Sequence, residues 1–292
     1  MKNKLFSIIL LLSGLQVFSS PQIIAEDQID TIRTSSVLDT VRLLVNSDSV
    51  GSVEYFLPSA INNEIRINRR GYSISYNCDF NIANWVAYEL SAEETNSKVK
   101  RKNNFKPDPL LDSCQVVPGD YARSGFDKGH LAPSADMCWS FQAMEESFYM
   151  TNMAPQKPRF NRGIWKRLED QTRDWAVENN SVYIVTGPVL RNGLPTIGKN
   201  HVSVPEYFFR VIMDISEPEL KGIAFLMANK RLTGDLTDFA VSIDSVETLT
   251  GLDLFYTLPD EVETTLEHSF NPANWLWNGK ALKIEEEEDE NE

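Results

Sequence analysis

The chain has 292 residues, of which 42% are hydrophobic and 24% are charged, and this composition excludes a disordered or fibrous protein. The length fits one domain of roughly 250 residues or two smaller ones. The formal net charge of −14 at first argues against a nucleic-acid partner, because proteins that bind phosphates usually carry a basic surface.

Residues 1–20 have the layout of a secretory signal peptide. Two lysines precede an apolar run from Leu5 to Leu15, and small residues follow it. The run is shorter than the roughly 20 residues of a membrane-spanning helix and no later segment is long enough, so we expect no membrane span in the mature chain. A mitochondrial transit peptide would be rich in arginine, whereas the first arginine is Arg33. The sequence therefore predicts a secreted, periplasmic or extracellular protein, with an uncleaved N-terminal anchor as the alternative.

Residues 21–69 are expected to form an N-terminal lead-in that is partly helical, because apolar residues recur through residues 27–46. Two strands are expected at 71–76 and 85–90, where β-favouring residues alternate or run together. The polar segment 91–118 follows and contains Pro107, Pro109 and Pro118, which disfavour regular structure. Loops of that length in a compact domain are usually functional or mobile.

Helical periodicity returns at residues 141–149 and 162–177. Strand-like runs follow at 181–190, 207–214 and 223–228, and closing helices are expected at 245–252 and 259–266. This mixture of strands and helices predicts an α+β or α/β domain. Residues 276–292 are expected to form a disordered acidic tail, since residues 284–292 are nearly all acidic.

Three cysteines, Cys78, Cys114 and Cys138, would meet oxidising conditions after export. At most one intramolecular disulfide can form among three thiols, and their spacing does not show which pair forms it. No two cysteines have the C-x-x-C spacing of a zinc site and the three histidines are scattered. A zinc hydrolase is therefore not indicated.

The basic residues are concentrated in one part of the sequence. Residues 101–173 contain 11 Lys and Arg against 9 Asp and Glu, a net charge of +2, so the rest of the chain carries −16. Within them, residues 157–173 contain six basic residues and two acidic ones. Such a run is either a solvated helix face or a surface that binds phosphates. If it binds phosphates, the negative net charge no longer argues against a nucleic-acid partner.

Three short segments concentrate residues that can carry chemistry: FDKGHLAP at 126–133, TNMAPQ at 151–156 and NRGIWKRLE at 161–169. Each is ordinary alone, but the ordered set resembles the DNA/RNA non-specific endonuclease family, the ββα-metal nucleases. The resemblance runs from about Tyr72 to Leu258 and includes VPEYFF at 204–209 and LTGLD at 249–253.

The resemblance implies an α+β fold over residues 70–275, the ββα-metal or His-Me finger nuclease fold, with a central and mainly antiparallel sheet flanked by helices. It implies an endonuclease that hydrolyses phosphodiester bonds of DNA and RNA without sequence specificity. It also implies a divalent cation, Mg²⁺, with Mn²⁺ as a substitute.

Phosphodiester hydrolysis needs a base that activates water, positive charge beside the phosphoryl oxygens and stabilisation of the leaving oxygen. His130 suits the first task, because an imidazole with a reference pKa near 6.5 is largely neutral at neutral pH and can accept a proton. It is the only one of the three histidines that lies in such a motif. We therefore expect His130 to be the general base.

The resemblance implies that the Asn161 amide oxygen binds the cation directly and that Glu169 holds a water molecule of its hydration shell. Mg²⁺ prefers oxygen ligands and keeps most of its waters, so one amide can suffice as the direct ligand. Across one continuous helix, eight residues turn through about 800°, or about 80° beyond two full turns. The side chains of Asn161 and Glu169 could therefore both approach one ion. Asn152 matches a further asparagine of the family and is expected to order the site; the alternative is an ordinary turn residue before Pro155.

The sequence departs from the family pattern at two positions that concern phosphate binding. Lys128 stands where better-known members commonly have arginine, and it can neutralise a phosphate but cannot clamp it with a planar fork. The upstream arginine that touches the scissile phosphate should lie within residues 99–105. Arg101 is the assignment, with a neighbouring register as the alternative.

Base-specific recognition needs a module such as a helix-turn-helix or zinc finger, and the sequence contains no recognisable one. DNA and RNA should therefore be contacted at their phosphates, by Arg101, Lys128 and the basic run 157–173. The alternative function is a secreted nucleic-acid-binding protein of the same fold with little or no catalysis. The presence of the base, the amide and the carboxylate at compatible spacing argues against it.

Overall fold

The computed structural model describes residues 56–96, 99–215, 220–268 and 270–280. The expected signal peptide 1–20, the apolar stretch 27–46 and the acidic end 284–292 lie outside these ranges. Among the described residues, no helix combines the length and the apolar character needed to cross a membrane.

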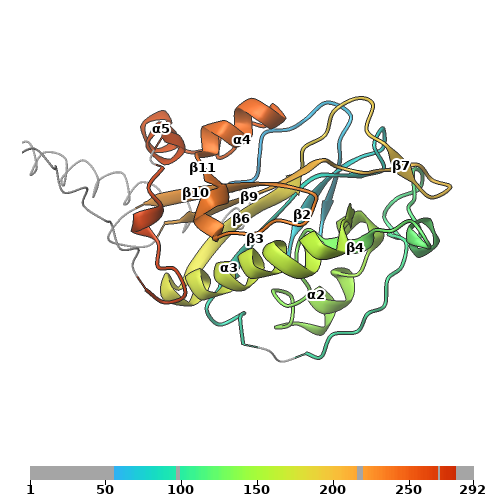
Figure 1. The fold of residues 1–292 in the computed structure, drawn as a ribbon, viewed down its shortest axis with the longest axis horizontal. Coiled ribbons are helices and arrows are strands. Elements are labelled where there is room, and N and C mark those ends of the chain that lie inside the picture. The colour runs from blue at the N-terminus through green and yellow to red at the C-terminus, as the bar shows by residue number, and fades with distance from the viewer. Residues whose placement is uncertain (1–55, 97–98, 216–219, 269, 281–292) are drawn as a thin grey trace, which may run out of the picture.

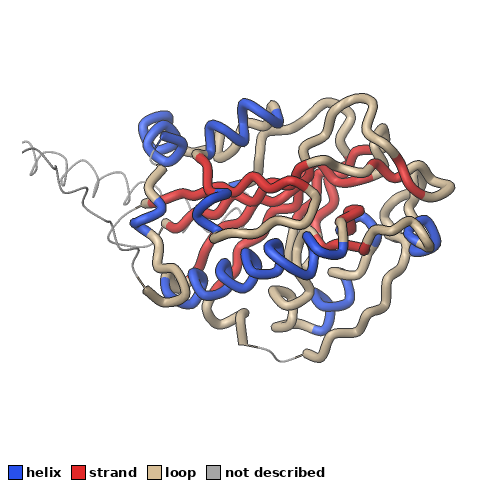
Figure 2. Tube along the Cα trace, in the orientation of Figure 1, coloured by secondary structure: helices blue, strands red, loops and turns tan. Residues whose placement is uncertain are grey.

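A seven-stranded sheet forms the centre of the molecule, and all its neighbouring strands pair antiparallel (Figures 1 and 2). In spatial order its strands are β1 (Ile65–Asn68), β2 (Ser73–Asn77), β3 (Ile82–Ser91), β6 (Ser181–Pro188), β9 (Tyr207–Asp214), β10 (Lys221–Ala228) and β11 (Ala240–Val241). The helices flank this sheet. The expected α+β fold with a central, mainly antiparallel sheet is confirmed.

Each face of the sheet carries its own apolar core, because successive residues of a strand point to opposite sides. One core lies between the sheet and α3 (Lys166–Glu178) and includes Trp175. The other lies between the sheet and the pair α4 (Ile243–Thr250) and α5 (Asp260–His268) and includes Trp85. Figure 1 shows α3 on one side of the sheet and α4 and α5 on the other.

The apolar stripe of α3 holds the helix against the sheet and against the C-terminal end of the described chain. Leu168 and Trp175 are fully buried. The Trp175 ring lies 4.7 Å from that of Trp275, and its Nε1 donates to the Leu276 carbonyl at 2.5 Å. Gln171 donates to the same carbonyl at 3.1 Å. Residues 276–280, which begin the segment expected to be a tail, therefore pack on α3.

A smaller antiparallel ribbon lies beside the α3 face of the sheet. It consists of β4 (Asp127–His130) and β5 (Met153–Gln156). The chain between them contains α2 (Phe141–Glu146) and the 3₁₀ turn η3 (Met150–Asn152). After β5, the π-type turn η4 (Phe160–Trp165) leads directly into α3.

The remaining short elements are η2 (Pro118–Tyr121), η5 (Leu236–Phe239), η6 (Pro272–Asn274) and a hairpin of β7 (Thr196–Ile197) and β8 (Val202–Ser203). Between β3 and η2, the described residues of the segment 92–117 form no helix and no named strand, as its prolines predict. A disulfide between Cys78 and Cys114 ties this segment to the end of β2. Cys138 is a buried thiol, so the expectation of a single disulfide with one cysteine left over is confirmed.

Three four-residue strands, β1, β4 and β5, were not expected from the sequence. β1 lies within the segment 21–69 and pairs with β2 along its whole length. β4 and β5 contain Gly129 and Pro155, which disfavour strands, and they form because each supplies the other's hydrogen-bond partners. The helix expected at 141–149 ends at Glu146. The helix expected from residue 162 becomes regular only at Lys166.

Candidate active site

The ribbon β4–β5 positions His130, the last residue of β4. The preceding residue, Gly129, pairs with Ala154, and a β-carbon at Gly129 would overlap the buried side chain of Gln156. Any larger residue between Lys128 and His130 would therefore have to displace the Gln156 side chain. His130 itself pairs with Met153, which fixes where the imidazole leaves the ribbon.

The imidazole of His130 is enclosed by aromatic rings and is 8% exposed. The Phe148 ring lies edge-on at 5.1 Å, and the Phe105 ring lies 5.7 Å away. Nε2 is buried and has no hydrogen-bond partner among the described residues. Burial, reinforced by the charge of Arg101, lowers the pKa of His130 to about 3. His130 is thus neutral over the whole physiological range.

Asn152 fixes the chain that follows His130. Its Oδ1 accepts from the Ala132 N–H at 2.9 Å, and its Nδ2 donates to the carbonyls of Ala132 and Ser147 at 2.9 Å each. The side chain is fully buried, so these bonds replace the water it has lost. Asn152 therefore orders the turn after β4, with its amide oxygen and both amide hydrogens bonded to backbone groups.

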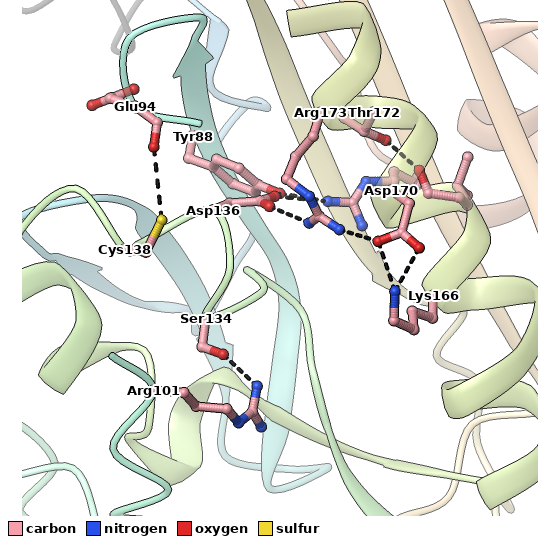
Figure 3. Close-up of polar contacts among 12 residues, drawn as sticks. Tyr88, Glu94, Arg101, Ser134, Asp136, Cys138, Lys166, Asp170, Thr172 and Arg173 are labelled. Carbon is pink, nitrogen blue, oxygen red and sulfur yellow. Dashed lines mark hydrogen bonds and ion pairs between the residues drawn. The ribbon is translucent and has the colours of Figure 1, made fainter. Parts of the chain in front are cut away.

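Arg101 reaches the site from the segment 92–117. Its Nη1 donates to Ser134 Oγ, shown in Figure 3, and its Nε donates to Asn103 at 2.7 Å. Its guanidinium lies 5.2 Å above the Phe148 ring, the ring that also touches His130. Its charge lowers the pKa of His130, while Glu169 partly offsets the lowering of Arg101's own pKa by burial. Arg101 thus lies within electrostatic reach of both groups.

Lys128 lies on the same ribbon as His130 and is only partly buried. Its ammonium lies 4.9 Å from the centre of the Phe105 ring and 5.9 Å from that of Tyr121. Phe105 is also a neighbour of His130. The structure therefore brings Lys128, Arg101 and His130 around one pair of aromatic side chains, Phe105 and Phe148.

Asn161 lies in η4, and its orientation is set by Asp127 of β4. Asn161 Nδ2 donates to Asp127 Oδ2 at 3.0 Å, and Arg162 binds the same carboxylate with two bonds of 2.8 and 2.6 Å. These bonds, with burial opposing, lower the pKa of Asp127, so its carboxylate stays charged. The amide oxygen Oδ1 has no hydrogen bond to any described residue, so Asn161 offers an oxygen ligand.

The prediction of a continuous helix between Asn161 and Glu169 is wrong. Gly163 has φ −109° and ψ −111°, which are not helical, and it interrupts the chain between the two residues. The angle of about 80° expected between the Asn161 and Glu169 side chains in an unbroken helix therefore does not apply. Glu169 keeps its place in the first turn of α3, on the regular part of the helix.

Glu169 lies beside a buried ionic network that the sequence did not indicate. Asp136 is its centre: it accepts from Tyr88 at 2.7 Å and from Arg173 at 2.6 Å (Figure 3). The Arg210 guanidinium is fully buried, donates to the Tyr88 hydroxyl and lies 3.8 Å from Asp136. Burial raises the pKa of Glu169 to about 7, with Arg210 opposing the rise. The charges of Asp136, Arg173 and Arg210 therefore all act on Glu169.

Asp127 and the residues of the ionic network belong to the site but could not be recognised from the sequence, for different reasons. Asp127 stands inside the quoted segment 126–133, but its role appears only when β4 is placed beside η4. Asp136, Arg173 and Arg210 come from three distant parts of the chain, so no spacing rule joins them. The one available signal was Arg210 itself, a charged residue in the middle of the mostly apolar strand β9.

The other histidines lie away from this site in sequence and structure. His201 is exposed in the β7–β8 hairpin, and His268 is the last residue of α5. Among the described residues, one cluster of three possible metal ligands of the His, Cys, Asp and Glu types is found, formed by Asp244, Glu247 and Glu267. It lies on α4 and α5, across the sheet from His130.

The chain matches the family model described as DNA/RNA non-specific endonuclease over residues 53–261. A nuclease of Nostoc sp. is 32% identical over 255 residues, which cover 83% of this chain and 90% of the relative. The Serratia marcescens nuclease is 32% identical over 232 residues, covering 75% of this chain and 86% of the relative.

Mitochondrial endonuclease G of Homo sapiens is 33% identical over 203 residues, which cover 63% of this chain and 67% of the relative. A crystal structure of the EndoG/EndoGI complex contains a chain that aligns with a TM-score of 0.66 at 30% identity. The alignment covers 71% of the present chain and 91% of that chain.

Proposed function

The chain belongs to the DNA/RNA non-specific endonuclease family and is a phosphodiester hydrolase, and from this we propose that His130 activates the attacking water while Asn161 holds a divalent cation. The observation that carries the proposal is the neutral, buried imidazole of His130 with an unpaired Nε2 beside Arg101. Such a group is unprotonated before the substrate binds, and its neighbours supply the positive charge that a phosphate requires.

His130 accepts a proton from water as the water oxygen attacks phosphorus and the bond to the leaving oxygen breaks. The low pKa of His130 in the free protein keeps this base unprotonated before the substrate binds. The bound phosphodiester is an anion, so its charge opposes that of Arg101 and favours the imidazolium as it forms. Phe105 and Phe148 hold the ring in place through this change.

The donor set around Asn161 fits a hard cation. The Oδ1 of Asn161 is unpaired among the described residues because Asp127 takes only the amide nitrogen, and an amide oxygen is the kind of ligand that a hard cation prefers. Asn161 would hold the cation directly, and Glu169 would orient its water. A cation such as Mg²⁺, or Mn²⁺ in its place, would supply positive charge to the phosphoryl and leaving oxygens.

Arg101 and Lys128 are proposed to bind the scissile phosphate. Arg101 is held by Ser134 and Asn103, which leaves part of its guanidinium fork for a phosphate oxygen. Lys128 can contribute a single charge from its position over Phe105. Asn152 takes no part in the chemistry in this proposal; it fixes the turn on which His130 depends.

The domain organisation and the location are proposed from the sequence. Residues 1–20 would be a signal peptide that directs a secreted or periplasmic protein, residues 21–69 a lead-in, residues 70–275 the nuclease domain and residues 276–292 an acidic tail. Pairing of β1 with β2 and packing of residues 276–280 on α3 extend the folded part beyond both ends of 70–275. The test is the N-terminal sequence of the protein recovered from culture medium or periplasm.

The decisive experiment is to incubate the purified protein with plasmid DNA and with RNA, with and without EDTA. We expect the protein to cleave both DNA and RNA, and we expect EDTA to abolish both activities. His130→Ala should lower turnover by roughly two to four orders of magnitude, the usual contribution of a general base, without loss of the folded state by circular dichroism. Binding without cleavage by the wild-type protein would instead support a nucleic-acid-binding protein of this fold, and near-normal turnover by His130→Ala would exclude His130 as the base.

A further inference from the structure

A groove of about 690 Å³ lies beside Asn161, between the start of α3 and the loop 229–235. One wall contains Arg159, Arg162 and Arg167, and the other contains Arg231. We call it the arginine groove. Its volume is in the range of ligand-binding clefts. The rest of its lining is aliphatic, small or hydroxylated, with no aromatic ring and no carboxylate among the lining residues.

The four arginines differ in how much of their charge is already used. Arg162 is paired with Asp127 at 2.6 Å. Arg167 donates to the Gly234 carbonyl at 3.0 Å and lies 3.8 Å from Asp235. Arg159 and Arg231 are exposed, and neither has a carboxylate partner within the described part of the chain. The groove therefore has one uncompensated guanidinium group on each wall.

The loop that carries Arg231 is fixed in position by Asn229. The Asn229 side chain accepts from the Lys157 N–H at 2.8 Å and donates to the carbonyls of Pro155 and Pro205 at 3.0 and 2.9 Å. Its own N–H donates to the Glu206 carbonyl at 2.8 Å. Arg231 is thus held next to the end of β5, the strand that leads into η4 and Asn161. The second wall of the groove is built into the fold.

We propose that the arginine groove binds backbone phosphates of the substrate strand next to the scissile phosphate, with Arg159 and Arg231 as the contacting residues. The inference rests on the proposed function, because Asn161 locates the scissile phosphate and Arg159 and Arg162 flank Asn161 in the chain. A guanidinium fork matches two phosphate oxygens, which explains why both walls use arginine. Without an aromatic ring for bases to stack on, the groove offers its contacts to the phosphate backbone rather than to the bases.

Binding to a labelled duplex DNA in EDTA over a series of salt concentrations tests the groove without any cleavage. Each phosphate contact contributes about 0.9 to the log–log slope on duplex DNA. Arg159→Gln and Arg231→Gln should each lower the slope by about 0.9, and the double variant by about 1.8. Arg191→Gln is the matched control, since Arg191 is also exposed but is paired with Glu206 outside the groove, and its slope should equal that of the wild type. An unchanged slope in the folded double variant would overturn the proposal.

Kinetics on two substrates separate the groove from the reacting centre. The groove variants should raise KM for plasmid DNA by roughly tenfold per arginine, the loss expected for a charge-assisted hydrogen bond. Their kcat/KM for bis(p-nitrophenyl) phosphate, which is too small to extend from Asn161 along the groove, should stay within about twofold of the wild type. Equal losses on both substrates would place the two arginines at the reacting centre and refute the groove. If the wild-type protein cleaves neither substrate, the proposed function fails, while the slope in EDTA still decides whether the groove binds phosphate.

Discussion

At the scale of single residues, Asn161 shows how one hydrogen bond can prepare a ligand. Asp127 takes the amide nitrogen and leaves the oxygen without a partner among the described residues. The same carboxylate carries two bonds from Arg162, so it is itself held in place. An amide that is free to rotate would lose this orientation, which matters because a cation ligand must be pre-positioned to bind well.

Asn161→Ala should raise the Mg²⁺ concentration required for half-maximal cleavage, because it removes the direct ligand. Asp127→Asn should raise it by a smaller factor, within roughly 10- to 100-fold, since the ligand remains but its orientation is lost. Glu169→Ala should act less steeply than Asn161→Ala, or lower the rate at saturating Mg²⁺. Titration of activity with Mg²⁺ measures all three, with the exposed loop residue Asn192→Ala as control. Identical Mg²⁺ curves for Asn161→Ala and the wild type would move the ligand elsewhere.

His130 predicts a pH dependence of stability. Its pKa is about 3 in the folded protein and near 6.5 when unfolded, so below pH 6.5 the unfolded state binds the extra proton. This loss of stability begins as pH falls through 6.5 and grows until about pH 3, and it is on the order of 2 kcal/mol at pH 5. Thermal unfolding in EDTA should therefore show wild type losing more stability than His130→Gln between pH 8 and pH 5. Parallel curves would show that burial does not hold the imidazole neutral.

At the scale of elements, the described residues of the segment 92–117 form a long irregular loop fixed at a few points. The Cys78–Cys114 disulfide ties its end to β2, and Lys106 pairs with Tyr149 near its middle. The loop delivers Arg101 and Phe105 to the neighbourhood of His130. Its irregularity follows from its prolines, and its position follows from these anchors.

Cys78→Ala/Cys114→Ala should lower the free energy of unfolding by about 2–4 kcal/mol, because the disulfide closes a long loop of the unfolded chain. KM should rise as well, since Arg101 is then less constrained. Urea unfolding and steady-state kinetics measure the two effects. Cys138→Ala is the control: it truncates a buried thiol, leaves the disulfide intact and should leave KM unchanged. Dithiothreitol should reproduce the loss in the wild type and add nothing in the double variant.

The elements with strong periodicity could be predicted from the sequence, and those that depend on a distant partner could not. β9 forms at its expected residues because FFRVIM is apolar enough to be buried on both faces. The ribbon β4–β5 contains glycine and proline, so its strands become visible only when paired. The candidate residues came from the motifs, but Gly163 broke the helix that was assumed between two of them. The network of Asp136, Arg173 and Arg210 depends on the tertiary fold and could not be predicted from spacing.

At the scale of the whole molecule, the basic residues of the site and one acidic cluster lie on opposite faces of the sheet. The arginine groove, Arg101 and Lys128 lie on the α3 side, whereas α4 and α5 carry the acidic cluster Asp244, Glu247 and Glu267. In a chain of net charge −14, we expect a polyanion to be repelled by the acidic cluster and attracted to the arginine groove. Substrate should therefore approach in the orientation that the site requires.

Cleavage should accordingly depend on salt and not on sequence. Affinity for duplex DNA should fall linearly in a log–log plot against salt, and Lys128→Ala should reduce the slope by about one without changing where the DNA is cut. Mapping the ends produced from one labelled duplex at two salt concentrations measures this. A few discrete cuts that persist at high salt would contradict a contact made only with phosphates.

The two-sided sheet also determines how the molecule can be attached to a solid support. Thr248 is exposed on α4, across the sheet from His130, and the one unpaired cysteine among the described residues, Cys138, is buried. A cysteine introduced at Thr248 would offer an accessible thiol for tethering to a bead. The tethered protein would turn its arginine-lined side toward the liquid, where long polymers can reach it. Immobilisation through α4 should therefore preserve most of the activity, whereas random coupling would block part of it.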